Sequence, residues 1–196
     1  YGTGTETGVF GGTSGAAPMV TGSAALLIQA YPARRPAEIK AVLMNTAETE
    51  IMNTPAFFGG ALAAISRIGG GEVRVDRAIE STAAAWVGNG ASAALSFGFV
   101  DVTGITKITK RVHVTNYSDQ AVVYDIARSF RFAADEATGA VTVKAPAKIK
   151  LDPGESRWFR VTLTIDGSLL SGNYMNSGAN GVNPAVLTLM EYDGYV

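Results

Sequence analysis

The stretch from Gly12 to Gln29 limits most strongly what this chain can fold into, because it joins a turn of small residues to a long apolar run. No charged side chain occurs between Glu6 and Arg34. Alanine, leucine and isoleucine follow the turn at a density typical of a buried helix. A helix that is apolar on all sides and rich in alanine and glycine is expected at the centre of a large α/β domain.

A membrane-spanning helix is the main alternative for this stretch. Its apolar part is interrupted by Pro18, Gly22 and Ser23, and it is shorter than the roughly 20 apolar residues that a bilayer requires. We therefore predict a helix of a soluble domain from Ser14 to about Gln29, and no membrane span. Thr13 is a suitable N-cap residue for this helix.

The segment around Ser14 resembles the nucleophile segment of the subtilisin-like serine proteases, the subtilases of peptidase family S8. The family pattern is Gly-Thr-Ser-x-Ala-x-Pro, then any residue, Val, any residue and Gly, and this chain matches it from Gly12 to Gly22. An ordinary turn before an ordinary buried helix would not place Pro18 and Gly22 at the family spacing. The resemblance implies hydrolysis of peptide bonds, with Ser14 as nucleophile and backbone oxyanion donor. It also implies substrate-binding roles for Gly12 and Thr13.

Free backbone amides explain why a nucleophile belongs at such a place. The N-terminus of a helix presents unpaired N–H groups and the positive end of the helix dipole, and both can hold an oxyanion. Pro18 lies in or close to the first turn, where its missing N–H costs little. The small side chains next to Ser14 leave room for a substrate backbone.

Two later segments extend the resemblance. Residues 35–47 predict a second helix, with Pro36 at its first position and Glu38 at the positive end of its dipole. Subtilases carry a similar Pro-x-Glu-Ile-Lys helix ending in Thr-Ala shortly after the nucleophile helix. Residues 69–79 resemble the Gly-x-Gly-x-Val turn and short helix of the family. The resemblance covers residues 1–85 and corresponds to the C-terminal part of the catalytic domain.

The other members of the catalytic triad do not precede Ser14 in this sequence. The subtilase triad follows the order Asp, His, Ser along the chain, and the oxyanion asparagine of the family also precedes the serine. Residues 1–13 contain no Asp, His or Asn. The single histidine, His113, lies in an alternating pattern in which Val112 and Val114 share one face and Arg111 the other. We expect His113 to be a surface strand residue and not a relocated base.

These observations predict the C-terminal piece of a longer protease, inactive alone. Loss of the triad lowers the kcat of subtilisin by about 2 × 10⁶, and here the oxyanion asparagine and most of the substrate cleft are missing as well. The alternative interpretation is a non-catalytic binding or scaffolding module built around the second half of the chain.

Composition and charge limit the classes of partner that the chain is expected to bind. The formal net charge is −1, and the basic residues do not cluster along the chain, so we expect no nucleic-acid partner. The chain has no cysteine, so it has no disulfide and no cysteine-based metal site. We expect no metal and no cofactor, and a protein or peptide substrate. The resemblance implies a secreted or cell-envelope protein.

The amino-acid pattern changes near Trp86, where alanine-rich sequence is followed by short segments of alternating apolar and polar residues. Turn signals separate these segments at 116–119 and 152–155. The expected strands are 94–100, 106–115, 121–130, 141–145, 148–151, 157–165, 172–175 and 185–191. The fold class is therefore α/β for a partial subtilisin-like domain at 1–88, mainly helical in this piece, followed by an all-β antiparallel sandwich at 91–196.

The second half also resembles the fibronectin-type-III-like domain that follows the catalytic domain in large extracellular subtilases. The resemblance rests on 114–116 before a polar turn, on 123–124, and on 151–156 before an alternating strand. Trp158 and Phe159 suggest a carbohydrate surface, although a sandwich core with one exposed aromatic explains them more simply.

Finally, the truncation leaves the helix after Ser14 with an uncovered apolar surface. We expect the missing N-terminal part, another copy, or a rearrangement of residues 1–85 to cover it.

Overall fold

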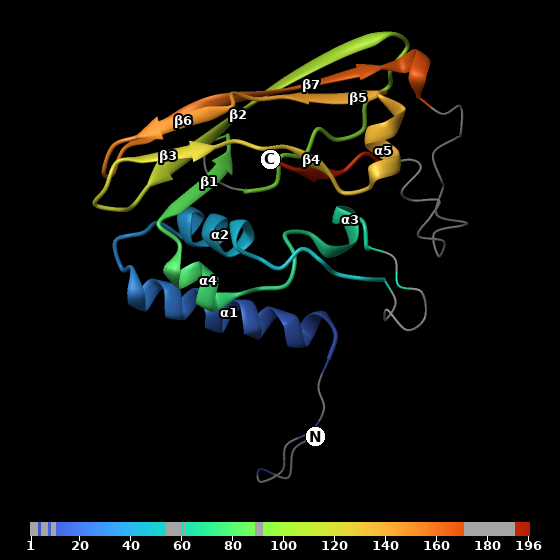
Figure 1. Ribbon diagram of the computed structural model, residues 1–196. Coiled ribbons are helices and arrows are strands. Elements are labelled where there is room, and N and C mark those ends of the chain that lie inside the picture. The colour runs from blue at the N-terminus through green and yellow to red at the C-terminus, as the bar shows by residue number, and fades with distance from the viewer. Residues whose placement is uncertain are drawn as a thin grey trace.

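An antiparallel sheet and a layer of helices make up most of the described chain, with strand β1 running between them (Figure 1). The structure is a computed structural model that describes residues 4, 8, 11–53, 60, 62–88, 92–170 and 191–196. The helices are α1 (Thr13–Ala30), α2 (Pro36–Asn45), α3 (Ile65–Ile68), α4 (Val75–Glu80), α5 (Ala133–Thr138) and the 3₁₀ helix η2 (Gly167–Leu169). The strands are β1 (Ala83–Val87), β2 (Ile105–Asn116), β3 (Val122–Asp125), β4 (Ser129–Phe130), β5 (Val141–Lys144), β6 (Lys148–Leu151), β7 (Ser156–Asp166) and β8 (Gly194–Tyr195).

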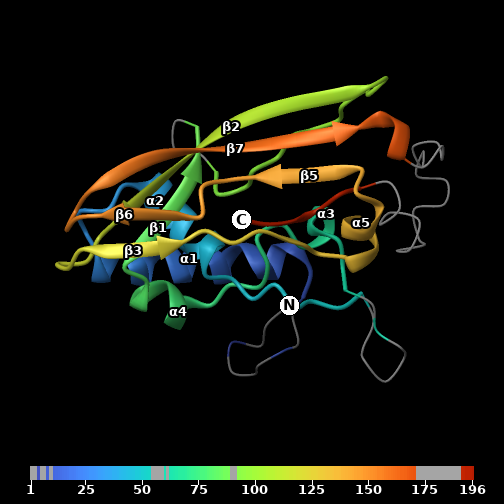
Figure 2. The same ribbon diagram turned by 45° about the horizontal axis from the view of Figure 1, so that its top comes forward.

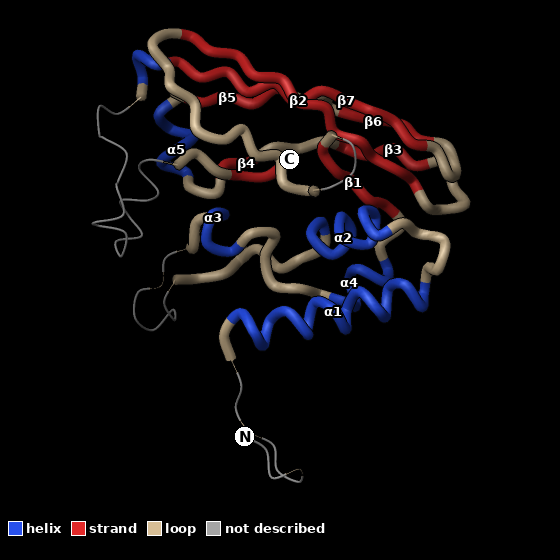
Figure 3. Tube along the Cα trace, turned by 180° about the vertical axis from the view of Figure 1, so that it is seen from behind, coloured by secondary structure: helices blue, strands red, loops and turns tan. Residues whose placement is uncertain are grey.

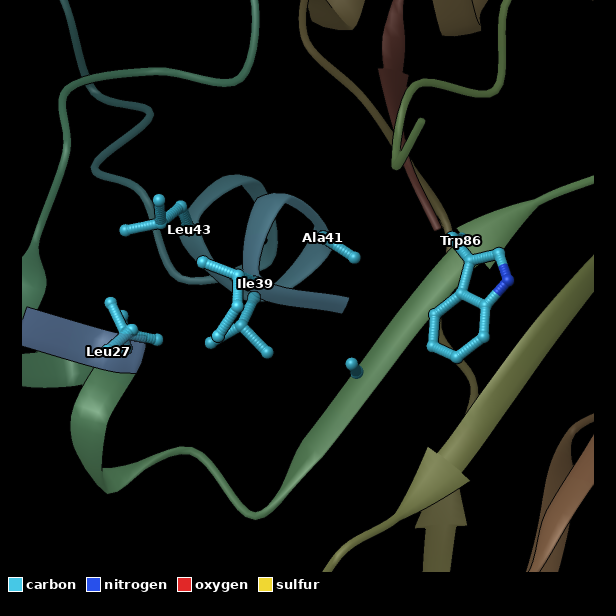
Figure 4. Close-up of a cluster of buried hydrophobic side chains, with 8 residues drawn as sticks. Leu27, Ile39, Ala41, Leu43 and Trp86 are labelled. Carbon is cyan, nitrogen blue, oxygen red and sulfur yellow. The ribbon is translucent and has the colours of Figure 1, made fainter. Parts of the chain in front are cut away.

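The helical layer consists of α1, α2 and α4, which lie together on one side of the molecule when it is seen from behind (Figure 3). Its core is a cluster of buried side chains from these helices and from β1 (Figure 4). The cluster contains Leu27, Ile39, Ala41, Val42, Leu43, Ala78, Ala84 and Trp86. Leu27 is fully buried, and burial of one leucine side chain stabilises a fold by about 1.5–3 kcal/mol.

Helix α2 begins as the sequence predicts. Pro36 is its first residue, and Glu38 lies in its first turn. The Glu38 carboxylate accepts a hydrogen bond of 2.7 Å from the backbone N–H of Arg35, which satisfies one of the amides at the start of the helix. It also accepts a hydrogen bond of 2.8 Å from the Tyr117 hydroxyl, so α2 is joined to the turn after β2.

The main sheet has four antiparallel strands in the order β1-β2-β7-β5. Strand β1 pairs with β2, with Trp86 opposite His113, and β2 pairs with β7, with His113 opposite Trp158. Two smaller antiparallel pairs, β3 with β6 and β4 with β8, complete the strands that the structure describes. Figure 2 shows β3 and β6 side by side next to the main sheet.

One face of the main sheet is covered by apolar side chains. Val114 and Phe159 of the sheet pack with Ile149 and Leu151 of β6. Farther along the same face, a second cluster around Val141 and Ile165 packs against the segment before β2 and against the C-terminal residues. The antiparallel strands predicted at 106–115, 141–145, 148–151 and 157–165 are therefore confirmed, whereas a complete fibronectin-type-III-like sandwich stays a prediction.

Two predicted turns are held together by a single buried side chain. Asn116 is fully buried, and its amide donates hydrogen bonds to the carbonyls of Gln120, at 2.7 Å, and Asp152, at 3.2 Å. Its side-chain oxygen accepts a hydrogen bond of 3.0 Å from the backbone N–H of Ser118. Asn116 therefore ties the turn after β2 to the turn between β6 and β7.

Several expectations differ from the structure. Residues 94–100 form no strand, because Gly98 has a positive φ of 72° that breaks extended backbone. The expected strand 121–130 is interrupted, so that β3 and β4 pair with different partners. The expected strand 172–175 and nearly all of 185–191 lie outside the described residues.

The description of the first part as mainly helical is not supported. Loops separate its helices, and β1, at 83–87, joins the main sheet by pairing with β2. The division into 1–88 and 91–196 stays a prediction.

Candidate active site

Ser14 is the second residue of α1, and its side chain is exposed. The N-cap residue is Gly12, with φ 82° and ψ −175°, and its carbonyl accepts hydrogen bonds from the amides of Gly15, at 3.0 Å, and Ala16, at 3.1 Å. Thr13 is the first helical residue, so its assignment as the N-cap is wrong. The reason is local: the turn into α1 requires a left-handed φ that glycine adopts readily and threonine does not.

The start of α1 leaves backbone donors open. The Gly15 amide is the first that bonds to the Gly12 carbonyl, so the amides of Thr13 and Ser14 precede the hydrogen bonds of the helix. No side chain caps this end. Within the described residues the Ser14 hydroxyl has no hydrogen-bond partner either. A free hydroxyl and a free amide on one residue are what a nucleophile with its own oxyanion donor needs.

Pro18 changes the hydrogen bonding next to Ser14. It is the sixth residue of α1, just beyond the first turn. Because proline has no N–H, it cannot donate to the carbonyl four residues earlier, which is that of Ser14. The serine therefore lies on a helical turn whose backbone is less fully paired than that of an ordinary helix.

The surroundings of α1 leave much of the helix open. Only Ser23 and Leu27 of this helix are buried. Met19 is 66% exposed and Ile28 is 50% exposed, which are high fractions for large apolar side chains. The expected uncovered apolar surface on this helix is present in the structure, and residues 1–85 do not rearrange over it within the described part of the chain.

The structure does not bring His113 to Ser14. Strand β2 and helix α1 lie on opposite sides of α2 (Figure 1). The His113 ring is 4.4 Å from the Trp86 ring and 4.6 Å from the Trp158 ring, measured between centroids. It is half-buried, so the prediction of a surface strand residue is only partly right. Tryptophans on both neighbouring strands stand in register with it, and that pairing is not visible in the local pattern.

The electrostatics of His113 also argue against a poised base. Burial lowers the pKa of the imidazole below its ordinary value, and the nearby Arg35 guanidinium lowers it further, while Glu38 raises it. Its Nδ1 atom is buried and has no hydrogen-bond partner within the described residues. In the described part of the chain no carboxylate accepts a hydrogen bond from this Nδ1 atom, as the aspartate of a triad would.

A second group of titratable residues lies where α5 meets the C-terminal segment. Asp135 is buried, and desolvation, followed by the charges of Asp193 and Glu191, raises its pKa to about 6. Asp193 accepts a hydrogen bond of 2.5 Å from the backbone N–H of Ile65, and burial raises its pKa as well. Within the described residues no group of three or more His, Cys, Asp or Glu side chains is arranged to hold a metal ion.

The sequence interpretation missed Asp135 and the burial of Trp86. The signal for Trp86 was its position near the end of a short apolar run, 83–87, followed by a Gly-Asn-Gly turn signal, which is consistent with a buried strand. No local signal marks Asp135, because its acidic neighbours come from more than 50 residues away in the chain.

Comparison with known proteins supports the sequence resemblance. The model of the subtilase family, Peptidase_S8, matches residues 2–99, which are half of the 196 residues. No curated protein matches the chain. Among solved structures, the FixG-related protein from Vibrio parahaemolyticus aligns with 47% of this chain and 73% of its own length, at 18% identity and a TM-score of 0.32. A TM-score this low does not show a common fold.

The class that these observations define is a protease-type hydrolase. The chain belongs to the subtilase family. No helix within the described residues combines the length and apolar character needed to cross a membrane.

Proposed function

We propose that this chain carries the nucleophile of a subtilisin-like serine endopeptidase, and that the nucleophile is Ser14. The observation that carries the proposal is the exposed serine at the uncapped N-terminus of α1, within the segment that matches the family pattern. In this mechanism a histidine removes the proton of the Ser14 hydroxyl and an aspartate orients the histidine. The serine oxygen attacks the peptide carbonyl, an acyl-enzyme forms, and water hydrolyses it.

The aspartate and histidine of the triad come, in this proposal, from polypeptide outside these 196 residues. The only histidine in the sequence is His113, which lies in β2 between two tryptophan rings. The 196-residue chain is therefore inactive alone. It corresponds to the end of a catalytic domain followed by a fibronectin-type-III-like domain.

The same proposal includes a substrate class and a cellular location. The substrate is a protein or peptide, and the backbone at Gly12 and Thr13 borders the bound chain. The reaction uses no cofactor. The parent protein is secreted or held in the cell envelope, as is common among subtilases.

The exposed side chains of α1 are covered in the active protein. Four large apolar residues on α1 are at least 47% exposed, and such surfaces associate in water. They are Met19, Val20, Leu26 and Ile28. The occupant that we propose is the rest of the catalytic domain, and in its absence a second copy of the chain.

Complementation tests this function. The 196-residue chain is mixed with the polypeptide encoded directly upstream of Tyr1, and hydrolysis of a fluorogenic peptide and labelling by a fluorophosphonate probe are measured. We expect neither signal from the chain alone, and both signals from the mixture, with the label on Ser14. Ser14→Ala removes both signals, whereas Thr21→Ala, which deletes an exposed hydroxyl farther along the same helix, leaves them unchanged.

Two results would contradict the proposal. Turnover by the chain alone that disappears in Ser14→Ala would show that the missing triad residues are not needed. A mixture that forms a stable complex and shows neither hydrolysis nor labelling would favour the alternative function, a non-catalytic binding or scaffolding module.

A further inference from the structure

The face of the main sheet opposite the clusters around Val114 and Val141 carries cations and an exposed aromatic ring along β2, β7 and β5, whereas at β1 the same face packs on the helical layer through Trp86. The register of the strands places Arg111 opposite Arg160, Lys107 opposite Thr164, and Lys144 opposite Thr162. Because side chains alternate along a strand, these residues share one face with Trp158. We call this surface the cationic face and define it by five exposed residues: Lys107, Arg111, Lys144, Trp158 and Arg160.

The charge on the cationic face is not balanced by the protein. Within the described residues none of its four cations forms an ion pair; the ion pairs that are present involve other residues. The acidic residue in register on this face is Asp166, whose carboxylate accepts hydrogen bonds from the backbone N–H and the hydroxyl of Ser168. The fold therefore gathers on one face cations that lie as much as 53 positions apart in the sequence, although the basic residues do not cluster along the chain.

The most unusual feature of the cationic face is that two arginines lie next to each other on it. Arg111 and Arg160 stand directly opposite each other on neighbouring strands. Like charges in that arrangement destabilise a sheet. A carboxylate placed between two guanidinium groups removes the repulsion and accepts charge-assisted hydrogen bonds from both, which makes the pair a suitable anion site.

Trp158 adds an apolar surface to this anion site. Its side chain is 41% exposed, and the Arg111 guanidinium lies 5.2 Å from the centroid of its ring. The His113 ring makes a T-shaped contact with the indole at 4.6 Å between centroids, which limits the movement of Trp158. Phe159, in contrast, packs in the apolar cluster on the opposite face, as the sequence interpretation expected. An indole held in this way offers a flat surface for stacking beside the arginine pair.

The backbone of the cationic face is only partly engaged in strand pairing. Among the described residues, β1 pairs with residues 112–116 of β2 and β5 pairs with residues 162–165 of β7, so the rest of each outer edge has no strand beside it. These backbone groups point along the plane of the sheet, so a ligand that lies across the cationic face is recognised by the side chains of that face. Sugar rings have apolar C–H faces that stack on an indole, and uronic acids carry a carboxylate next to that face.

We propose that the cationic face binds an acidic polysaccharide, with a sugar ring on Trp158 and its carboxylates between Arg111 and Arg160 and along Lys107 and Lys144. Lys107 and Arg111 are four residues apart on β2, which is about 13 Å, and neighbouring strands are about 4.8 Å apart, so the face can contact successive acidic sugars. This inference does not depend on the proposed peptidase function. In a secreted protein, such a surface would hold the enzyme on an anionic matrix.

Binding to polygalacturonate tests the inference, measured by calorimetry on the 196-residue chain at about 0.05 M and about 0.5 M salt. We expect binding at low salt that is strongly weakened at high salt, and no binding to neutral dextran. R111Q/R160Q should lower the affinity about tenfold or more. K148Q/K150Q is the matched control, because it removes the same charge from exposed positions on β6, and we expect a change of less than about threefold.

A third variant separates stacking from charge. Trp158→Ala leaves the net charge unchanged and should lower the affinity for polygalacturonate about tenfold. Far-UV circular dichroism verifies that each variant is folded. Equal losses in R111Q/R160Q and K148Q/K150Q would overturn the inference, as would the absence of binding at low salt. Equally tight binding of polyglutamate or of a single-stranded oligonucleotide, unaffected by Trp158→Ala, would also overturn it.

Discussion

Replacement of Asn116 by alanine should destabilise the second half of the chain strongly for a single polar side chain. Asn116 is fully buried. Its amide donates hydrogen bonds to three carbonyls, and its oxygen accepts hydrogen bonds from the Ser118 amide and from the hydroxyls of Ser118 and Tyr124. The carbonyls of Gln120 and Asp152 keep other donors, from the Ser118 hydroxyl and the Glu155 amide. The Ser118 amide, however, loses the acceptor that the structure gives it.

The magnitude follows from these contacts. The three shorter hydrogen bonds to backbone groups, those to the carbonyls of Gln120 and Asp152 and from the Ser118 amide, contribute about 1 kcal/mol each net. The hydroxyls can rotate to other partners, whereas one amide is left without a partner, so Asn116→Ala should lower the free energy of unfolding by about 3 kcal/mol. Urea denaturation measures this change. With a slope of about 2 kcal/mol/M, the midpoint should fall by about 1.5 M.

Gln120→Ala is the matched control for this experiment. Gln120 is exposed, and its contacts with Asn116 and Ser118 use only its backbone carbonyl and amide. Its replacement should change the free energy of unfolding by less than about 0.5 kcal/mol. The reasoning is refuted if the midpoint of Asn116→Ala falls no further than that of Gln120→Ala.

Three other predictions concern the helices and the buried acid. Asp135 has a pKa of about 6 in the folded chain, against an ordinary 3.8, so its protonated form favours folding: this stability is present below pH 4 and is lost as the pH rises through 6. Asp135→Asn should therefore raise the melting temperature at pH 8 more than at pH 4. Gly12→Ala should destabilise the folded chain by about 1–2 kcal/mol, because Gly12 has a φ of 82° that alanine adopts poorly. Gly22→Ala should stabilise it by up to about 1 kcal/mol, because Gly22 lies inside α1 and an added Cβ would meet open space. Thermal denaturation compares the two variants. Leu27→Ala should cost about 2–5 kcal/mol and speed hydrogen exchange in α1, because Leu27 is the large side chain that anchors this helix.

Local sequence signals predicted the elements whose formation depends on near neighbours. Helix α2 begins at Pro36 as expected, because proline at N1 and an acidic first turn act within one helical turn. The long strand β2 and its partner β7 follow the alternation of apolar and polar residues, and the two turns that Asn116 joins lie at the predicted positions. The position of Ser14 at the start of α1 follows from the same kind of local information.

Strand register explains most of what the sequence did not predict. The burial of His113 depends on two tryptophans that lie 27 positions before it and 45 positions after it in the sequence. The opposition of Arg111 and Arg160 arises in the same way. At the candidate active site, the prediction of Thr13 as the N-cap of α1 was wrong for a different reason. The choice between Gly12 and Thr13 depends on one backbone angle, which residue preferences alone do not determine.

The pairing of β1 with β2 has a consequence for anyone who divides this chain. A piece that begins at residue 91 would lack β1, and the N–H and C=O groups of β2 that now bond to β1 would become a free sheet edge. The same cut would uncover the side of His113 that Trp86 protects. Such a piece should form edge-to-edge oligomers, so a stable excised second half should start before Ala83 and keep its edge strand.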